Sequence, residues 1–165
     1  MQLKQVNHEF YVADQISQRD VAELANKGIK TIICNRPDGE GVDQPNIIEI
    51  QEVASTHGIQ VEYLPVVSGR VTDEQAEEFK SVYQAAQKPI LAFCRTGTRS
   101  ITLWGLSQLS GLSLDQMLLV SKTLGYDLQG LVPRILNQHP TQLNNVPKFS
   151  VVIVGGGAAG ISVAS

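Results

Sequence analysis

Cysteine, excess basic charge and long apolar runs are all scarce in this 165-residue chain, and each shortage excludes a class of protein. Two cysteines, Cys34 and Cys94, are too few and too far apart for a disulfide framework. Lysine and arginine number 13 against 16 aspartates and glutamates, so the net charge of −3 gives no basic footprint for a nucleic acid. No apolar run approaches the roughly 20 residues that cross a bilayer, and the amino end carries no secretory signal. We therefore expect a cytoplasmic protein with no membrane span, in which each cysteine is either a buried apolar residue or a working thiol.

Short apolar segments alternate with amphipathic ones over the first 138 residues. The expected strands are residues 2–6, 10–12, 30–34, 61–67 and 90–93. The expected helices are residues 17–28, 45–57, 72–87, a segment from about residue 100, and two helices within 113–138 that separate near residues 126 and 127. Because strands and helices alternate, the predicted fold class is α/β, with a mainly parallel central sheet flanked by helices. Ligands of such sheets bind beyond the carboxyl ends of the strands, where Cys94 falls.

The composition changes after residue 138. Residues 139–148 hold two prolines and several polar residues, which is typical of a linker. An apolar segment then leads into Gly155-x-Gly157-x-x-Gly160, the dinucleotide-binding fingerprint in its usual context. We interpret residues 149–165 as the truncated start of a dinucleotide-binding domain in a longer parent protein, with FAD, or NAD(P), as the expected cofactor of that parent. The alternative is a glycine-rich tail. Residues 1–138 form the first domain, for which we expect no cofactor and no metal site.

The segment after the strand at 90–93 carries the predicted chemistry. It reads Cys94-Arg95-Thr96-Gly97-Thr98-Arg99-Ser100. Gly97 lets the loop curl so that successive N–H groups form an anion-binding nest, and the following helix adds the positive end of its dipole. Arg99 supplies a planar fork for two oxygens of an oxyanion. These features favour the thiolate of Cys94, so we predict that Cys94 is a nucleophile rather than a structural cysteine.

Other residues have two open interpretations. Arg95 is either a solvated charge or an attractor of the anionic substrate, and Ser100 is a helix cap whose hydroxyl could also face the thiolate. Cys34 is predicted to be core, with a resolving thiol as the alternative. Arg36 and Asp38 follow a neighbouring strand and either line the same cleft or pair with each other, and Ser68 is a further candidate for the cleft wall. The three histidines are expected at the surface and show no metal-ligand spacing.

These motifs resemble known families. The Cys94–Ser100 loop is similar to the active-site loop of bacterial rhodaneses and to the signature of cysteine-dependent phosphatases. Together with residues 33–40 and 64–67, it makes residues 2–138 resemble the phosphatase-like domain named after beta-lactamase-hydrolase-like proteins. The resemblance implies the fold of dual-specificity phosphatases. Some members are fused to persulfide dioxygenases or to flavoproteins resembling sulfide:quinone oxidoreductases, and residues 151–161 are similar to the start of such a flavoprotein, the expected partner within the parent chain.

Two details separate sulfur from phosphoryl chemistry. Four residues lie between Cys94 and Arg99, one fewer than in protein phosphatases, and the shorter loop is that of rhodaneses. The stretch 65–70, where phosphatases of this fold carry a general acid, has no carboxylate, and Asp73 and Glu74 fall at a helix start. The sequence therefore favours a sulfurtransferase that moves sulfane sulfur from thiosulfate or a persulfide through a Cys94 persulfide. The alternatives are a phosphatase that works through a Cys94 phosphoenzyme and a non-catalytic anion-binding module that regulates an attached flavoprotein.

Overall fold

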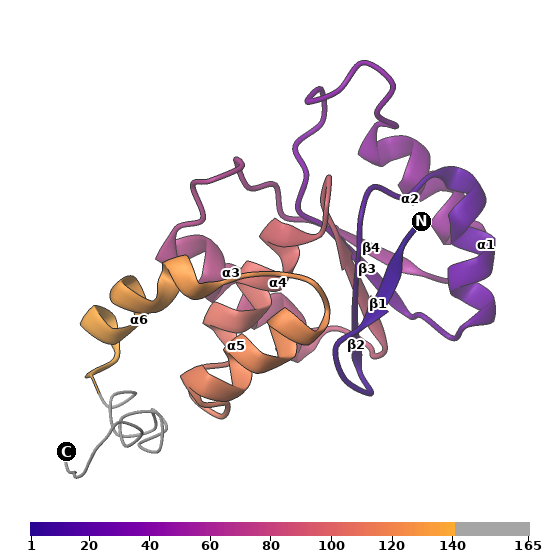
Figure 1. The fold of residues 1–165 in the computed structure, drawn as a ribbon. Coiled ribbons are helices and arrows are strands. Elements are labelled where there is room, and N and C mark those ends of the chain that lie inside the picture. The colour runs from indigo at the N-terminus through magenta and orange to yellow at the C-terminus, as the bar shows by residue number, and fades with distance from the viewer. Residues whose placement is uncertain (141–165) are drawn as a thin grey trace, which may run out of the picture.

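A five-stranded sheet, in the order β1-β2-β5-β3-β4, forms the centre of the computed structural model, which describes residues 1–140 (Figure 1). Its strands are β1 (Leu3–Gln5), β2 (Phe10–Ala13), β3 (Thr31–Cys34), β4 (Gln60–Tyr63) and β5 (Ile90–Phe93). The pairs β2–β5, β5–β3 and β3–β4 are parallel, and only β1 runs antiparallel to its neighbour β2. The predicted α/β class with a mainly parallel sheet is confirmed. Because parallel strands end at one edge, the segments after β3, β4 and β5 meet there.

Helices cover both faces of the sheet. Helices α1 (Gln18–Asn26) and α2 (Ile47–Thr56) lie on one face, and α3 (Asp73–Ala85), α4 (Thr98–Ser107) and α5 (Leu114–Thr123) lie on the other (Figure 1). The chain continues through a short 3-10 turn at Gln129–Leu131 into α6 (Val132–Gln138). Successive side chains of a strand point to opposite faces, so Ile32 joins the core under α1 and α2 while Ile33 joins the core under α3, α4 and α5. Each such fully buried side chain stabilises the fold by about 1.5–3 kcal/mol.

Local sequence signals set the helix starts. The Thr72 hydroxyl accepts a hydrogen bond from the Gln75 N–H, and the Gln75 side chain accepts one from the Thr72 N–H, which is the expected capping box of α3. Ser113 and Gln116 do the same for α5. A cap of this kind contributes about 1 kcal/mol. These starts are therefore encoded within four residues of sequence.

Two predicted boundaries were wrong. The strand expected at 61–67 ends at Tyr63, because Pro65 has no N–H to continue a ladder, although Leu64 and Val66 still donate to the β3 side. Helix α4 begins at Thr98 rather than near Ser100, since the left-handed backbone of Gly97 already serves as its N-cap. The two helices expected within 113–138 are present, with a wider separation than predicted. Most of the predicted linker lies outside the described residues. The predicted start of a dinucleotide-binding domain, with Gly155, Gly157 and Gly160, lies wholly outside them.

Candidate active site

Cys94 lies directly after β5, at the mouth of the loop that leads into α4. Strand β5 is buried along its whole length, and Cys94 itself is only 1% exposed. The Gly97 N–H donates to the Cys94 Sγ at 3.1 Å, so the loop curls back over the sulfur. A backbone N–H aimed at sulfur stabilises a thiolate more than a neutral thiol. The loop can thus hold a negative charge at Cys94.

Gly97 is required by its backbone conformation and by its neighbours. Its φ angle is +96°, in the left-handed region that disfavours side chains. A Cβ atom there would collide with the Tyr126 hydroxyl and approach the Val12 Cγ1 to 3.1 Å. The Tyr126 hydroxyl donates to the Thr96 carbonyl at 3.0 Å, and the Lys4 ammonium lies 4.3 Å from the centre of the tyrosine ring. Tyr126 therefore braces the loop from behind.

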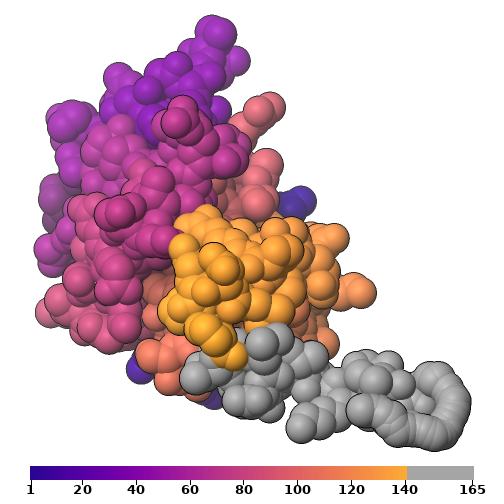
Figure 2. All heavy atoms as spheres, turned by 90° about the vertical axis from the view of Figure 1, so that its left-hand side faces the viewer, coloured from indigo at the N-terminus to yellow at the C-terminus, as the bar shows by residue number. Residues whose placement is uncertain are grey.

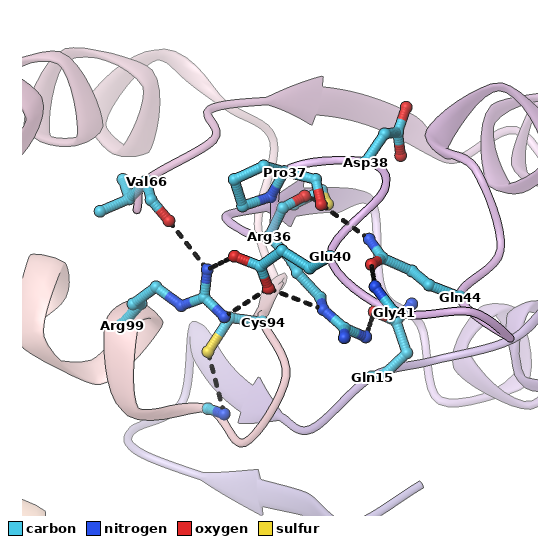
Figure 3. Close-up of polar contacts among 12 residues, drawn as sticks. Gln15, Arg36, Pro37, Asp38, Glu40, Gly41, Gln44, Val66, Cys94 and Arg99 are labelled. Carbon is cyan, nitrogen blue, oxygen red and sulfur yellow. Dashed lines mark hydrogen bonds and ion pairs between the residues drawn. The ribbon is translucent and has the colours of Figure 1, made fainter. Parts of the chain in front are cut away.

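Arg99 is held by Glu40 through two parallel hydrogen bonds (Figure 3). Its Nη1 donates to Glu40 Oε2 at 2.7 Å and its Nη2 donates to Glu40 Oε1 at 3.0 Å, while Nη1 also donates to the Val66 carbonyl at 2.8 Å. A guanidinium has two such forks, and Glu40 occupies the one formed by Nη1 and Nη2. Glu40 does not use the fork formed by Nε and Nη2, and Arg99 also has a side-chain hydrogen bond with Cys94, so an oxyanion at that fork would lie beside the sulfur.

The pKa values of this pair agree with a fixed ion pair. Burial acts to lower the pKa of Arg99, but the hydrogen bond to Glu40 and the charge of Cys94 outweigh it and raise that pKa. The hydrogen bond from Arg99 lowers the pKa of Glu40, with help from Arg36. Glu40 is thus ionised at neutral pH, and Arg99 contacts both Cys94 and the Glu40 carboxylate.

A network continues from Glu40 to the amino-terminal half of the chain. Arg36 Nε donates to Glu40 Oε1 at 2.9 Å, and Arg36 Nη1 donates to the Gln15 side chain at 3.0 Å (Figure 3). The Gln15 N–H donates to the Arg95 carbonyl at 3.3 Å, which returns the network to the anion loop. Two cations, Arg36 and Arg99, therefore share one carboxylate, so these three side chains together carry a net positive charge.

Ser100 and Asn35 join the loop to β3. The Ser100 hydroxyl donates to Asn35 Oδ1 at 2.8 Å, and Asn35 Nδ2 donates to the Leu64 carbonyl at 2.9 Å. Both residues are fully buried. Ser100 lies inside the first turn of α4 rather than at its cap, and its hydroxyl is directed at Asn35. This contact aligns the starts of α4 and of the segment after β3.

The structure brings some predicted residues together and separates others. Arg36, Ser68, Arg95 and Arg99 line one cavity of about 320 Å³ together with Glu40 and Gly41. Thr96 and Thr98 lie on the exposed side of the loop, where their hydroxyl oxygens are 3.0 Å apart. Asp38 does not line this cavity and does not pair with Arg36, because its Oδ1 accepts from the N–H of Ile47 at the start of α2.

Other sequence-based expectations have clear outcomes. Cys34 is core, as predicted: it is 3% exposed, and burial raises the pKa of its thiol to about 12. Asp73 is engaged by Arg134 and Gln138, and the hydrogen bond from Arg134 lowers the pKa of Asp73. The three histidines are exposed. Within residues 1–140 no group of three or more His, Cys, Asp or Glu could hold a metal, and no helix there is long and apolar enough to cross a membrane.

Sequence reasoning missed Glu40, Asn35 and Tyr126. Glu40 lies 59 positions from Arg99, and Asn35 lies 65 positions from Ser100. A contact at that separation follows from which strands are neighbours in the sheet, here β3 beside β5. The signals available were the position of Asn35 directly after a buried parallel strand, and of Glu40 in the loop that follows, where ligands bind in such folds, and the place of both in the segment 33–40 that carries the family resemblance.

Fold and site together define the class of this chain: a phosphatase-like domain with a cysteine at the head of its anion loop. Solved structures with a similar fold are dual-specificity and protein tyrosine phosphatase folds. One is the catalytic domain of the PP-IP phosphatase of S. cerevisiae, which is 17% identical, covers 88% of this chain and 94% of its own, and has a TM-score of 0.62. At that identity the likeness concerns the fold alone.

The chain belongs to the family described as beta-lactamase hydrolase-like protein, phosphatase-like domain, whose profile matches residues 2–111. A beta-lactamase hydrolase-like protein of Agrobacterium fabrum strain C58 is 31% identical over 134 residues, which are 78% of this chain and 30% of that protein. A crystal structure of a candidate phosphatase from Neisseria meningitidis Z2491 is 32% identical, covers 83% of this chain and 98% of its own, and has a TM-score of 0.75. These relatives fit a cysteine-based phosphatase-like function better than the sulfur transfer that loop length favoured.

Proposed function

We propose that this domain is a cysteine-dependent phosphatase that hydrolyses phosphate monoesters through a phosphoenzyme on Cys94. The observation that carries the proposal is the pairing of two features at one site. The Cys94 Sγ accepts a hydrogen bond from the Gly97 N–H, and Arg99 is fixed by Glu40 through one fork and contacts Cys94, so its second fork can bind an oxyanion that replaces this contact. Phosphatase-named relatives with the same fold support it.

The reaction balances with groups that the site contains. The Cys94 thiolate attacks phosphorus, an S–P bond forms, and the bond to the leaving-group oxygen breaks while Arg99 and the loop N–H groups bind the other phosphoryl oxygens. Water then attacks the phosphorus, the S–P bond breaks, and inorganic phosphate and the thiolate are released. Both steps need stabilised negative charge rather than a cofactor.

The cavity beside Arg99 offers no carboxylic acid to protonate the leaving group. Glu40 is the one carboxylate that lines the 320 Å³ cavity within the described residues, and Arg99 holds it ionised. An ionised carboxylate cannot act as a general acid. Substrates whose leaving group needs no proton, such as aryl phosphates, are therefore expected to react much faster than alkyl phosphates.

The test is phosphate release from a series of aryl phosphates, with Cys94→Ser as the variant and Cys34→Ser as the matched control. We expect turnover in the wild type and in Cys34→Ser, no turnover in Cys94→Ser, and rates that fall steeply as the leaving group becomes more basic. Turnover that survives in Cys94→Ser would contradict the proposal. A kcat/KM that does not depend on the leaving group would contradict the absence of a general acid, because kcat/KM reports the step in which the leaving group departs.

Sulfur transfer is the second candidate, and the four residues between Cys94 and Arg99 favour it. A contracted loop suits a single persulfide sulfur, and thiolate or sulfite leaves without a proton. Thiocyanate formation from thiosulfate and cyanide, lost in Cys94→Ser and unaccompanied by phosphate release from aryl phosphates, would replace the phosphatase assignment by this one.

A further inference from the structure

Two cavities share residues of the anion loop that begins at Cys94, although the buried Cys94 itself lines neither of them. The first is the 320 Å³ cavity beside Glu40. The second, which we call the α6 lobe, is a cavity of about 300 Å³ that extends from the loop to Arg134 of α6. It is lined by Ser68, Gly69, Val71, Arg95, Thr96, Thr98, Arg99, Thr102, Leu131 and Arg134. Ser68, Arg95 and Arg99 belong to both lobes, so a ligand held at the loop can extend into either.

The walls of the α6 lobe are positive and hold no carboxylate. Three arginines line it, the hydroxyls of Thr96, Thr98 and Ser68 add polar atoms, and Val71 and Leu131 form its apolar part. The Glu40 lobe differs, because its carboxylate pairs with both Arg99 and Arg36. Of the two lobes, only the α6 lobe offers cations to a ligand without an opposing anion in its wall.

Arg95 is available to a ligand. Its side chain is exposed, and it forms no hydrogen bond or ion pair with any residue of the described range 1–140. It follows Cys94 directly and lines both lobes. An unpaired guanidinium this close to the nucleophile meets any anion that enters the cleft.

Arg134 is available at small cost. It reaches back from α6 to the loop before α3: Nη1 donates to the Val71 carbonyl at 2.8 Å, and Nη2 donates to Asp73 at 2.7 Å. Figure 2 shows α6, in orange, packed against the magenta surface to which that loop belongs. The pair is open to solvent, with 30% of the Arg134 side chain and 55% of the Asp73 side chain exposed, and ion pairs of that kind contribute little to stability. Asp73 lines a different cavity, so its carboxylate does not enter the α6 lobe.

We propose that the α6 lobe binds a second anionic group of the substrate, so that the preferred substrates are bis-anionic: a phosphoryl group at Cys94 and a phosphate or carboxylate a short linker away, between Arg95 and Arg134. This inference rests on the proposed function for the role of the first phosphoryl group. The apolar contacts of Val71 and Leu131 accommodate the linker, and the threonine hydroxyls donate to the second anion.

Binding of non-hydrolysable phosphonates by the wild-type domain tests the lobe without any turnover. The probes are methylphosphonate, which has one anionic group, and methylene-, propylene- and pentylene-bisphosphonate, which have two at increasing separation. We expect at least one bisphosphonate to bind about tenfold or more tightly than methylphosphonate, as for a charge-assisted contact. Arg134→Gln and Arg95→Gln should each remove most of that gain.

Two further variants test whether a loss of affinity comes from unfolding or from the change of net charge alone. Arg70→Gln removes the same charge from the same loop region but lines neither lobe, and it should keep the gain. Asp73→Asn keeps an acceptor for Arg134 while it removes the competing charge, so it should tighten the bisphosphonate; a damaged fold would not bind more tightly.

Equal affinities for methylphosphonate and the bisphosphonates would contradict a second anion site in the α6 lobe. The same conclusion would follow if Arg70→Gln abolished the gain in bisphosphonate affinity as fully as Arg134→Gln does. Phosphate release from phenyl phosphate is measured in parallel. If phenyl phosphate is turned over while methylphosphonate and the bisphosphonates bind equally well, the second anion site is refuted and the proposed function stands. If the bisphosphonates bind more tightly than methylphosphonate but phenyl phosphate is not turned over, the proposed phosphatase function is refuted and the second anion site stands.

Discussion

Replacing Glu40 by glutamine is the sharpest perturbation of the site, because one carboxylate serves two guanidinium groups. Glu40 accepts from Arg99 at 2.7 and 3.0 Å and from Arg36 at 2.9 Å. The two arginine side chains are only 7% and 9% exposed, and that of Glu40 is 27% exposed. An amide keeps one acceptor oxygen, loses the charge and adds two donors that face cations, so at least one guanidinium is left poorly paired.

The expected loss of stability is about 1–3 kcal/mol, the usual cost of leaving a largely buried polar group without its partner. The hydrogen bond from Arg99 lowers the pKa of Glu40 below its ordinary value of 4.5. A carboxyl group with a lowered pKa stabilises the fold above its unfolded-state pKa, and that contribution is lost as the pH falls through the folded-state pKa. The wild type should therefore be more stable than Glu40→Gln at neutral pH, and the difference should begin to shrink as the pH falls below about 4.5 and vanish once the pH lies below the lowered folded-state pKa.

Activity should fall further than stability suggests. Without the Glu40 fork, Arg99 can rotate away from the phosphoryl group, and a misplacement of about 1 Å costs on the order of a hundredfold in rate. We expect kcat on an aryl phosphate to fall about ten- to a hundredfold with a smaller change in KM, since Arg99 is needed most where charge develops.

The assay is steady-state kinetics with thermal denaturation at several pH values, and Glu52→Gln is the matched control. Glu52 is an exposed residue of α2, so the same change of charge there should alter neither property. Higher activity in Glu40→Gln would refute the positioning argument, because it would mean that Glu40 competes with the substrate for Arg99. Unchanged kinetics would show that Arg99 does not act on the substrate.

Three further predictions follow from the loop and the core. Gly97→Ala should lose activity and about 1–3 kcal/mol of stability, because the backbone at this position is left-handed and the added Cβ would meet the Tyr126 hydroxyl. Steady-state kinetics and the melting temperature measure the two effects. The double variant with Tyr126→Phe should recover part of the stability. Alkylation by iodoacetamide at pH 8, followed by peptide mass analysis, should leave Cys34 unmodified, because burial keeps its pKa at about 12; label on Cys34 in the folded domain would contradict this. Ser100→Ala should cost about 1 kcal/mol in denaturant unfolding through the lost hydrogen bond, and an unchanged stability would count against that contact.

The sequence was most informative about the site residues that lie close together along the chain. Cys94, Gly97 and Arg99 stand within six residues, and the strand–loop–helix order around them follows from local patterns, so their juxtaposition was predictable. The alternation of apolar strands and amphipathic helices likewise predicted the sheet, since a parallel sheet requires helical crossovers. The capping box at Thr72 and Gln75 fixed the start of α3 within one residue.

The partners of the loop could not be predicted because they come from distant segments. Glu40 reaches Arg99 only because β3 lies beside β5, and the strand order is a property of the whole chain. Tyr126 reaches the loop from the connection after α5, which carries no periodic pattern. Asp38 illustrates the opposite error: it stands in a segment rich in charged residues beside the site, yet the N-terminus of α2 binds it.

The central claim is that Cys94 carries the reaction, and its most direct test is to trap the intermediate. The domain is mixed with an aryl phosphate, quenched in acid within the first turnover, digested and analysed by mass spectrometry. We expect one phosphoryl group on the peptide that contains Cys94, absent in Cys94→Ser and present in Cys34→Ser. Phosphate release with the phosphoryl group on another residue, or without any dependence on Cys94, would contradict it.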